Sequence, residues 1–265
     1  MMIDALNGTL AGRHIVVTRP AHQADNLCAQ LEKAGAVVWR FPSLDITPLV
    51  DAAHIQAALQ KLKPHDWLLF VSRNAVTLTA THLLQYLQTT ERPRIIAVGA
   101  ATAQCLQELG IALTFAPPAP YNSEALLAHE LLQHVQHQQI LIVRGQGGRE
   151  LLRETLEQRG AHVSYLEVYR RDAADLPIAL ITQLSNALAQ HTIDALIITS
   201  EASLHALIDA LAIKDTPPVW QTRLVVISER LYTVARSLGF NGDIWIAQTA
   251  SDEAIINCLQ NGFHA

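Results

Sequence analysis

The chain has 265 residues, which suffices for two domains of ordinary size or for one large domain. Its 19 Lys and Arg residues against 24 Asp and Glu residues give a formal charge of −5, which argues against a nucleic-acid binder that depends on bulk positive charge. Hydrophobic residues make up 50% and charged residues only 16%, so intrinsic disorder is excluded and an anionic ligand must be bound by local groups.

The three cysteines are widely separated and form no CxxC pair, so neither a disulfide framework nor a zinc ribbon is indicated, and a reducing compartment fits best. The N-terminal residues lack the basic and apolar regions of a secretion signal. No uncharged apolar stretch reaches the roughly 18 residues that a membrane span needs. These features predict a soluble cytoplasmic protein, and the low charge makes a monomer the default expectation.

Short apolar runs alternate with amphipathic stretches along the whole chain. In chain order, the expected strands are 14–18, 66–71, 94–98, 140–143, 194–198 and 223–227. The stretches between them have apolar residues three or four positions apart, as in Leu27, Leu31 and Ala34, and Gly35 and Gly160 close two of the expected helices. This order of strand, turn, helix and glycine is typical of βα units in a mostly parallel sheet.

The two halves of the chain match element by element at offsets of 125 to 129 residues. Arg19 and Arg144, each at the end of an apolar run, both stand sixteen residues before a glycine that ends a helix. The other matches are Asp66–Ser72 with Asp194–Ser200, Gly99–Gly110 with Ser228–Gly239, and the expected helix caps Ser123 and Asp252. Matches in the same order indicate a duplication, and therefore two similar α/β domains with ligand groups at the carboxyl ends of their strands.

Two stretches do not fit this rhythm, namely 41–48, which contains Pro42 and Pro48, and its repeat counterpart 166–171. Proline lacks the N–H that a central strand needs, and it favours an extended chain. We therefore expect both stretches to be crossovers between the domains instead of core strands. Two crossings would form a double hinge.

The sequence Arg144-Gly-Gln-Gly-Gly-Arg149 follows an apolar strand and opens a helix. Free backbone N–H groups, a helix dipole and two guanidinium groups suit a carboxylate or a phosphate. The alternative is that the glycines only allow a tight turn and that the arginines are solvated. A dinucleotide site is disfavoured because Glu150 stands where GxGxxG needs its third glycine, and no P-loop motif is present.

Metal and covalent chemistry have little support in the sequence. His129, His134 and His137 fall on one expected helical window, but no acid or cysteine joins them at ligand spacing, so a solvated helix end is the simpler interpretation. No GxSxG or Ser/His/Asp pattern is present. Tyr169, flanked by two arginines on an expected crossover, suits either hinge packing or a reach into an interdomain gap. Hydroxyl groups that suit either helix capping or ligand binding are Ser72, Thr102, Thr199 and Ser200.

Together these segments resemble the uroporphyrinogen-III synthase family nearly end to end. The matching segments are 17–20, 70–76, 97–99 with 102–103, 121–127, 144–149, 168–170 and 198–200. The resemblance implies an enzyme of porphyrin, tetrapyrrole and heme biosynthesis that cyclises hydroxymethylbilane, with inversion of ring D and loss of water, to uroporphyrinogen III. It implies a cyclising hydro-lyase that needs no cofactor. One departure from the family is Ser228-Glu229-Arg230-Leu231-Tyr232, which replaces a Gly-x-x-Thr-Ala turn.

The same resemblance implies two similar Rossmann-like domains with parallel sheets, joined by a two-stranded linker, with the active-site cleft between them. It places 1–41 with 170–265 in a terminal domain and 47–165 in a central domain, and it makes 42–46 and 166–169 the crossover linkers. The central domain then has the more basic strand ends, whereas Glu201 and Glu229 stand on the terminal side. We therefore expect the central domain to make most contacts with the carboxylates of the substrate.

Site residues follow from the family as well. Tyr169 matches the tyrosine expected to donate a hydrogen bond to the departing hydroxyl. The expected substrate-binding residues are Arg19, Ser72, Arg73, Asn74, Gly99, Thr102, Asn122, Ser123, Arg144, Gly145, Gly148, Arg149, Thr199 and Ser200. No cofactor and no metal are expected. The implied partners are the substrate and, transiently, hydroxymethylbilane synthase for its handover, with no nucleic acid and no membrane.

Two other classes of function remain open at the level of sequence. A non-catalytic two-lobed protein that binds a small anion would share the duplicated α/β pattern and the double hinge. A transferase acting on a nucleotide sugar would also use two lobes, although the acid pair that such an enzyme uses for a metal is missing.

Overall fold

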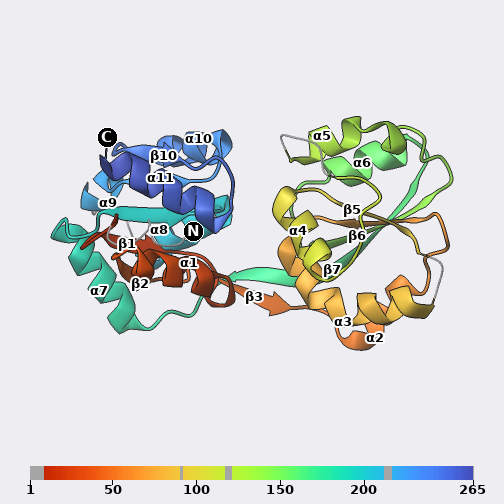
Figure 1. Cartoon of the computed structure of the whole chain (residues 1–265), viewed down its shortest axis with the longest axis horizontal. Helices are drawn as coiled ribbons and strands as arrows, with labels where there is room; N and C mark the ends of the chain where they lie inside the picture. The colour runs from red at the N-terminus through yellow and green to blue at the C-terminus, as the bar shows by residue number, and fades with distance from the viewer. Residues whose placement is uncertain (1–8, 90–91, 117–120, 212–216, 265) are drawn as a thin grey trace, which may run out of the picture. The chain divides into compact units, whose positions relative to one another are not determined.

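The computed structural model describes residues 9–89, 92–116, 121–211 and 217–264. The chain divides into two compact units, each with its own five-stranded sheet (Figure 1). The terminal unit consists of Met1–Asp45 and Asp172–Ala265, and the central unit consists of Ile46–Arg171. Among the described residues, no helix is long and apolar enough to cross a membrane.

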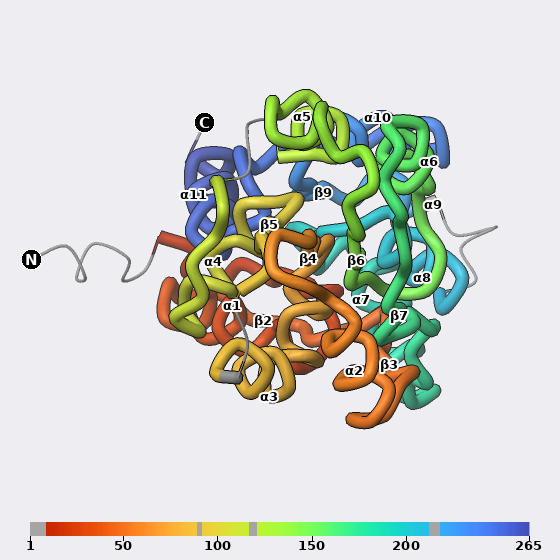
Figure 2. Tube along the Cα trace, turned by 90° about the vertical axis from the view of Figure 1, so that its right-hand side faces the viewer, coloured from red at the N-terminus to blue at the C-terminus, as the bar shows by residue number. Residues whose placement is uncertain are grey.

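The sheet of the central unit has the strand order β3-β7-β6-β4-β5. Its strands are β3 (Leu44–Pro48), β4 (Trp67–Phe70), β5 (Arg94–Ala97), β6 (Gln139–Gly145) and β7 (His162–Ala173). β7, β6, β4 and β5 pair in parallel. Figure 2 shows β5, β4, β6 and β7 from left to right. The carboxyl ends of these four strands therefore share one edge of the sheet.

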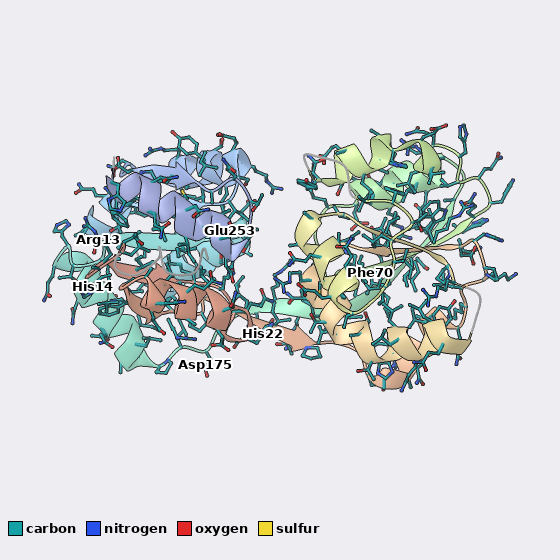
Figure 3. The ribbon with its side chains drawn as sticks, in the orientation of Figure 1. Arg13, His14, His22, Phe70, Asp175 and Glu253 are labelled. Atoms are coloured by element: carbon teal, nitrogen blue, oxygen red, sulfur yellow. The ribbon has the colours of Figure 1, made fainter. Side chains whose placement is uncertain are left out.

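Alternation of side chains along β4 explains the layers of the central unit. Leu68 and Phe70 pack in one hydrophobic cluster, and Trp67 and Leu69 pack in another on the opposite face (Figure 3). The helices on the Phe70 face are α2 (Ala52–Leu59), α3 (Arg73–Thr89) and α4 (Ala100–Glu108). Those on the Trp67 face are α5 (Ser123–Ala128), the short η2 (Glu130–Leu132) and α6 (Leu151–Gln158).

The sheet of the terminal unit has the order β10-β9-β8-β1-β2 and is parallel throughout. Its strands are β1 (His14–Val17), β2 (Val37–Arg40), β8 (Ala195–Ile198), β9 (Leu224–Val226) and β10 (Ile244–Ile246). On one face lie α1 (Ala21–Lys33) and α11 (Asp252–His264). On the other lie α7 (Ile178–Ala189), α8 (Glu201–Ala210), α9 (Pro217–Gln221) and α10 (Glu229–Ser237).

The sequence repeat appears in the two strand orders. By the repeat, β1, β2, β8 and β9 correspond to β6, β7, β4 and β5, and both sets occur in the same spatial order. The first βαβ of each half joins the later strands of the other half, so each sheet contains segments from both halves of the chain. The predicted α/β class with two similar parallel-sheet domains is confirmed, and all six predicted strands are present.

The expectation that 166–171 lies outside the core strands is wrong. These residues belong to β7, which lies between β3 and β6, and Leu166, Val168 and Tyr169 are buried. Prolines occur only in the counterpart segment, which forms the edge strand β3, so they did not constrain 166–171. The units divide within β3 and within β7, between Asp45 and Ile46 and between Arg171 and Asp172. The linker limits 42–46 and 166–169 stay a prediction.

Two smaller expectations need correction. The caps of α5 and α11 lie one residue earlier than predicted, because the Ala125 N–H donates to Asn122 and the Ala254 N–H donates to Ser251. His129, His134 and His137 do not share a helix. His129 follows the last residue of α5 with extended backbone, and His137 has a φ of 62°, in the left-handed region that an α-helix cannot continue through.

An aspartate occupies the corresponding position at the amino end of each sheet. Asp194 accepts hydrogen bonds from the His14 N–H (2.8 Å) and from Arg13 (2.8 Å), and Asp66 likewise accepts from the N–H of Gln139, the first residue of β6 (3.4 Å). Figure 3 labels Arg13 and His14 in the terminal unit. Each aspartate therefore ties the start of its own strand to the start of the neighbouring one.

We expect Asp194→Ala to destabilise the protein by about 1–3 kcal/mol, because the His14 N–H loses its acceptor at the amino end of β1. Urea unfolding followed by tryptophan fluorescence measures the loss. The matched control is Asp243→Ala, which removes an exposed carboxylate paired with Arg223 and is expected to change stability little. Equal losses in the two variants would contradict this role of Asp194.

Candidate active site

Three turns at the carboxyl edge of the central sheet gather the predicted polar residues. Ser72 follows β4, and its Oγ accepts from the Ala75 N–H (3.2 Å) and lies 3.0 Å from the Tyr169 hydroxyl. Gly99 follows β5 and caps α4 with extended backbone, at φ −123°. The turn 145–150 begins at Gly145, the last residue of β6, and leads into α6. All three turns precede helices whose first N–H groups have no intrahelical acceptor.

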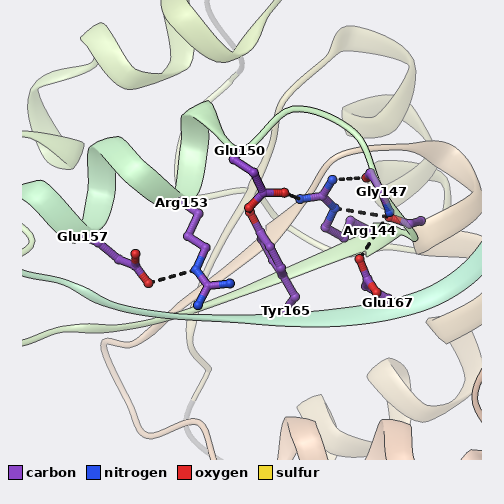
Figure 4. Close-up of polar contacts among 8 residues, drawn as sticks. Arg144, Gly147, Glu150, Arg153, Glu157, Tyr165 and Glu167 are labelled. Atoms are coloured by element: carbon purple, nitrogen blue, oxygen red, sulfur yellow. Dashed lines mark hydrogen bonds and ion pairs between the residues drawn. The ribbon is translucent and has the colours of Figure 1, made fainter.

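Arg144, one of the predicted substrate-binding residues, lies inside the turn that follows it (Figure 4). It is only 5% exposed. Its Nε donates to the Gly145 carbonyl (3.2 Å), its Nη2 to the Gly147 carbonyl and its Nη1 to Glu150 Oε1 (3.1 Å). The guanidinium also stacks on the Tyr165 ring, 4.4 Å from its centroid. All three guanidinium nitrogens are thus engaged within the central unit.

Tyr165 and Glu150 complete this network. The Tyr165 hydroxyl donates to Glu150 Oε2 (2.7 Å). Burial, together with this bond to a carboxylate, raises the pKa of Tyr165 to about 12. The hydrogen bond from Tyr165 and the charge of Arg144 lower the pKa of Glu150. Glu150 is therefore ionised and Tyr165 protonated at neutral pH, which is the pairing that the hydrogen bonds require.

Two other arginines at this edge remain exposed. Arg73 begins α3, and among the described residues no hydrogen bond or ion pair holds its side chain. Arg149 is 57% exposed and pairs with Glu124 in the first turn of α5 (2.7 Å). An exposed ion pair of this kind is weak, so the Arg149 guanidinium is free to exchange its partner.

Tyr169 is fully buried in β7, where it stands opposite Gly145 at the end of β6. Its hydroxyl accepts from Arg171 Nη2 (2.8 Å) and lies 3.0 Å from Ser72 Oγ. A Cβ at Gly145 would lie 2.5 Å from its Cζ, so the absence of a side chain there makes room for the ring. With Arg171 as donor, the phenol keeps its own proton for a second partner.

The remaining predicted residues of the central unit lie in helices or in the turns that precede them. Asn122 caps α5 through its side chain, and Ser123 is the first residue of that helix. Thr102 is buried within α4, which places it away from solvent. Asn74 lies in the first turn of α3, next to Arg73. Gly148 has a φ of 98°, which an L side chain rarely adopts.

The terminal unit has a pocket at the matching edge of its own sheet. Thr199 and Ser200, both predicted, line it together with Glu201, Ile227, Ser228, Arg230 and Leu231. Ser200 caps α8 and Ser228 caps α10. Arg230 pairs with Glu201 (2.6 Å) and was not predicted, although the departure at 228–232 from the family pattern pointed to this turn.

Arg19, which was predicted to bind substrate, is held inside the terminal unit. It pairs with Asp252 at the start of α11 and donates to the Ala250 carbonyl (2.8 Å), and its side chain is 11% exposed. Among the described residues, no group of three or more His, Cys, Asp or Glu side chains could hold a metal ion. The candidate binding groups of each unit are hydroxyls, guanidiniums and helix N-termini at the carboxyl edge of its own sheet.

Fold and side chains together define a duplicated two-unit α/β protein with polar groups gathered at the carboxyl ends of parallel strands. The sequence model of the family described as uroporphyrinogen-III synthase HemD matches residues 25–257. This match covers most of the chain, so the protein belongs to the uroporphyrinogen-III synthase HemD family, a family of enzymes of porphyrin biosynthesis. The resemblance found in the sequence is thereby confirmed.

Individual relatives agree with the family match. The uroporphyrinogen-III synthase of Escherichia coli K12 is 32% identical over 256 residues, which is 93% of this chain and 99% of the relative. That of Salmonella typhimurium LT2 is 33% identical over 257 residues, again 93% and 99%.

Solved structures share the fold. A mutant uroporphyrinogen III synthase of the extremely thermophilic bacterium Thermus thermophilus has a TM-score of 0.62 at 17% identity, with 95% of this chain and 99% of that one covered. The uroporphyrinogen-III synthetase of Helicobacter pylori 26695 has a TM-score of 0.57 at 17% identity, with the same coverage.

Proposed function

We propose that the protein is a cofactor-independent lyase that closes hydroxymethylbilane with loss of water and inversion of ring D to give uroporphyrinogen III. The observation that carries this proposal is the identity of 32–33% with two relatives named uroporphyrinogen-III synthase, over almost their entire length. The alternative of a non-catalytic anion-binding protein has no comparable support. We further propose a monomer in the cytoplasm that takes its substrate from hydroxymethylbilane synthase by transient handover.

In the proposed reaction, departure of the terminal hydroxyl leaves an electrophilic azafulvene. Ring D then attacks through its substituted carbon, and the resulting spiro intermediate fragments and closes again with the ring inverted. The unassisted bilane closes without inversion. The protein therefore has to fix a flexible chain that bears eight carboxylates, and such positioning can supply several kcal/mol of the barrier, on the order of that found for oriented intramolecular reactions.

The exposed polar groups of both sheet edges suit this task. We propose Arg73 and Arg149 as the cationic contacts of the central unit, because each guanidinium reaches solvent. We propose the capping serines Ser72 and Ser200 and the amides at the starts of their helices as hydrogen-bond donors, because these amides are fixed before the substrate arrives. The other predicted residues remain part of the proposed site, either as contacts or as groups that hold the contacting turns in place: Arg19, Asn74, Gly99, Thr102, Asn122, Ser123, Arg144, Gly145, Gly148 and Thr199.

The proposal is tested by incubating the protein with freshly made hydroxymethylbilane, oxidising the products and separating the porphyrin isomers. The type III isomer is expected to predominate, whereas buffer alone gives type I. A protein that binds the bilane but leaves the isomer ratio of the buffer control unchanged is not a synthase.

Tyr169→Phe is expected to lower turnover about tenfold and to raise the share of type I product, because the departing hydroxyl loses its proposed donor. In the proposed cycle the phenol exchanges Ser72 for that hydroxyl while Arg171 continues to donate to it. The matched control is Tyr86→Phe, a second buried tyrosine of the same hydrophobic cluster, which is expected to keep the isomer ratio. Full turnover of Tyr169→Phe with an unchanged ratio would contradict the role of Tyr169.

A further inference from the structure

Arg144 has the contacts of a buried framework residue and not those of a free anion ligand. Its guanidinium donates to two carbonyls of the turn that follows it and to the carboxylate of Glu150, and one face is covered by Tyr165. Its side chain is only 6% exposed, so a substrate carboxylate would compete with Glu150 for the guanidinium, and binding there would favour displacement of Glu150. The buried position also means that such a displacement would remove the partner of a desolvated charge, which is costly.

The glycines of the turn fit around this guanidinium. The Gly147 carbonyl accepts from Nη2, and a Cβ at Gly148 would lie 2.9 Å from that same nitrogen. Both glycines have positive φ, 72° and 98°. The Gly147 N–H is held on the other side by Glu167 Oε1 (3.3 Å). The conformation of the turn and the placement of Arg144 therefore depend on each other.

Glu150 links the turn to the sheet. One of its oxygens accepts from Arg144, and the other accepts from the hydroxyl of Tyr165 on β7 (Figure 4). Glu150 stands directly before α6, whose first residue is Leu151. The carboxylate thus fixes the start of the helix, the guanidinium and the neighbouring strand in one arrangement.

From these contacts we infer that Arg144 and Glu150 are positioning residues that hold the turn 145–150 in the shape that binds a substrate carboxylate. The carboxylate itself contacts Arg149, whose guanidinium is exposed, and the backbone amides of residues 148–150, because the amides of Gln146 and Gly147 already donate within the unit. This inference rests on the proposed function for the identity of the ligand. The statement that Arg144 and Glu150 order the turn does not depend on the ligand.

The direction in which Glu150→Gln changes KM distinguishes the two possible roles of Arg144. If Arg144 were an anion ligand restrained by Glu150, neutralising that carboxylate would free it, and KM for hydroxymethylbilane would fall. If Glu150 and Arg144 position the turn, KM rises about threefold to tenfold with little change in kcat, because binding is lost equally in the ground state and the transition state. An unchanged or lower KM overturns the inference.

Glu157→Gln is the matched control, since Glu157 lies on the same helix and pairs with Arg153 (3.0 Å) outside the turn. It is expected to leave KM unchanged. Arg144→Lys keeps the charge, but its three donors sit on one compact ammonium and cannot reach the Gly145 carbonyl, the Gly147 carbonyl and Glu150 together, so it is expected to raise KM more than Glu150→Gln. A Lys variant with the KM of the wild type would also overturn the inference.

A second readout does not depend on activity. Hydrogen–deuterium exchange of the peptide that spans 144–151 is expected to be about tenfold faster in Glu150→Gln than in the wild type or in Glu157→Gln. Equal exchange in all three proteins refutes the positioning role even where the enzyme is active. If the wild type forms no type III isomer, the proposed function fails, while the exchange result still decides whether Glu150 orders the turn.

Discussion

Gly145→Ala is expected to destabilise the protein by about 2–3 kcal/mol, because the added methyl group has no space. The new Cβ would lie 2.5 Å from Cζ and 2.6 Å from Cε2 of Tyr169, a ring that is fully buried and closed in by the core of the central unit. Either the strand end or the ring must move. Urea unfolding followed by tryptophan fluorescence measures the loss, and Trp67 reports on the core of the central unit.

The same substitution is expected to lower turnover and type III selectivity even under conditions where the variant is folded. Moving the Tyr169 ring separates its hydroxyl from Ser72 and Arg171, so the proposed donor is no longer in place. Turnover and isomer ratio are to be measured at a temperature where the variant is folded. Loss of type III selectivity with folded protein supports the expected coupling between Gly145 and Tyr169.

Gly147→Ala is the matched control for crowding. Gly147 has a φ of 72°, but nothing lies within 4 Å of the Cβ that would be added. Its substitution therefore adds only backbone strain, about 1 kcal/mol, and leaves the Tyr169 ring in place. If both alanine variants lose the same stability and the same selectivity, crowding at Tyr169 is not the cause.

Much of the fold follows from periodicity and from the repeat. Apolar runs located six of the strands that the structure describes. The shared distance of sixteen residues, from Arg19 to Gly35 and from Arg144 to Gly160, located two corresponding helices. Both glycines have positive φ, 93° and 82°, as helix-ending glycines do. These features depend on local chemistry, which the sequence states directly.

The partners of Arg144 could not be predicted in the same way. Tyr165 lies on β7, and its place beside Arg144 depends on the parallel pairing of β7 with β6, where Tyr165 stands opposite Ile142. Once 166–171 was taken as a crossover, this neighbouring strand was missing from the prediction. The tyrosine ring that covers one face of the Arg144 guanidinium was therefore missing as well.

The repeat did contain a clue to two other ion pairs. In each unit, an arginine that follows the first strand of its repeat pairs with an acid at the start of the corresponding helix. Arg19 follows β1 and pairs with Asp252 of α11, and Arg149 follows β6 and pairs with Glu124 of α5. The two arginines do not occupy equivalent positions, since Arg144 is the counterpart of Arg19, so the repeat relates only the two helices that supply the acids.

Arg144→Glu is expected to destabilise the protein by about 3–5 kcal/mol at pH 7, because it places a carboxylate in a buried position beside Glu150 and two carbonyl oxygens. By contrast, Arg19→Ala is expected to cost less, because Asp252 keeps its hydrogen bond from Asn26 (2.6 Å) and its place at the amino end of α11. Charge reversal at Arg144 should also weaken substrate binding more than removal of Arg19, now because the turn loses its shape.

The pH dependence of the stability of the Arg144→Glu variant tests whether a buried charge causes the loss. Burial and the neighbouring Glu150 disfavour the ionised form of the new carboxyl, so its pKa in the folded protein lies above the value of about 4.3 in the unfolded chain. The penalty is therefore full at pH 7 and shrinks as the pH falls through the raised pKa, since protonation removes the buried charge. The stability difference from the wild type, measured by urea unfolding at pH 7 and pH 5, is expected to be smaller at pH 5.

A variant that is as stable as the wild type at pH 7 would show that residue 144 is not enclosed by the turn. The positioning role assigned to Arg144 would fail with it.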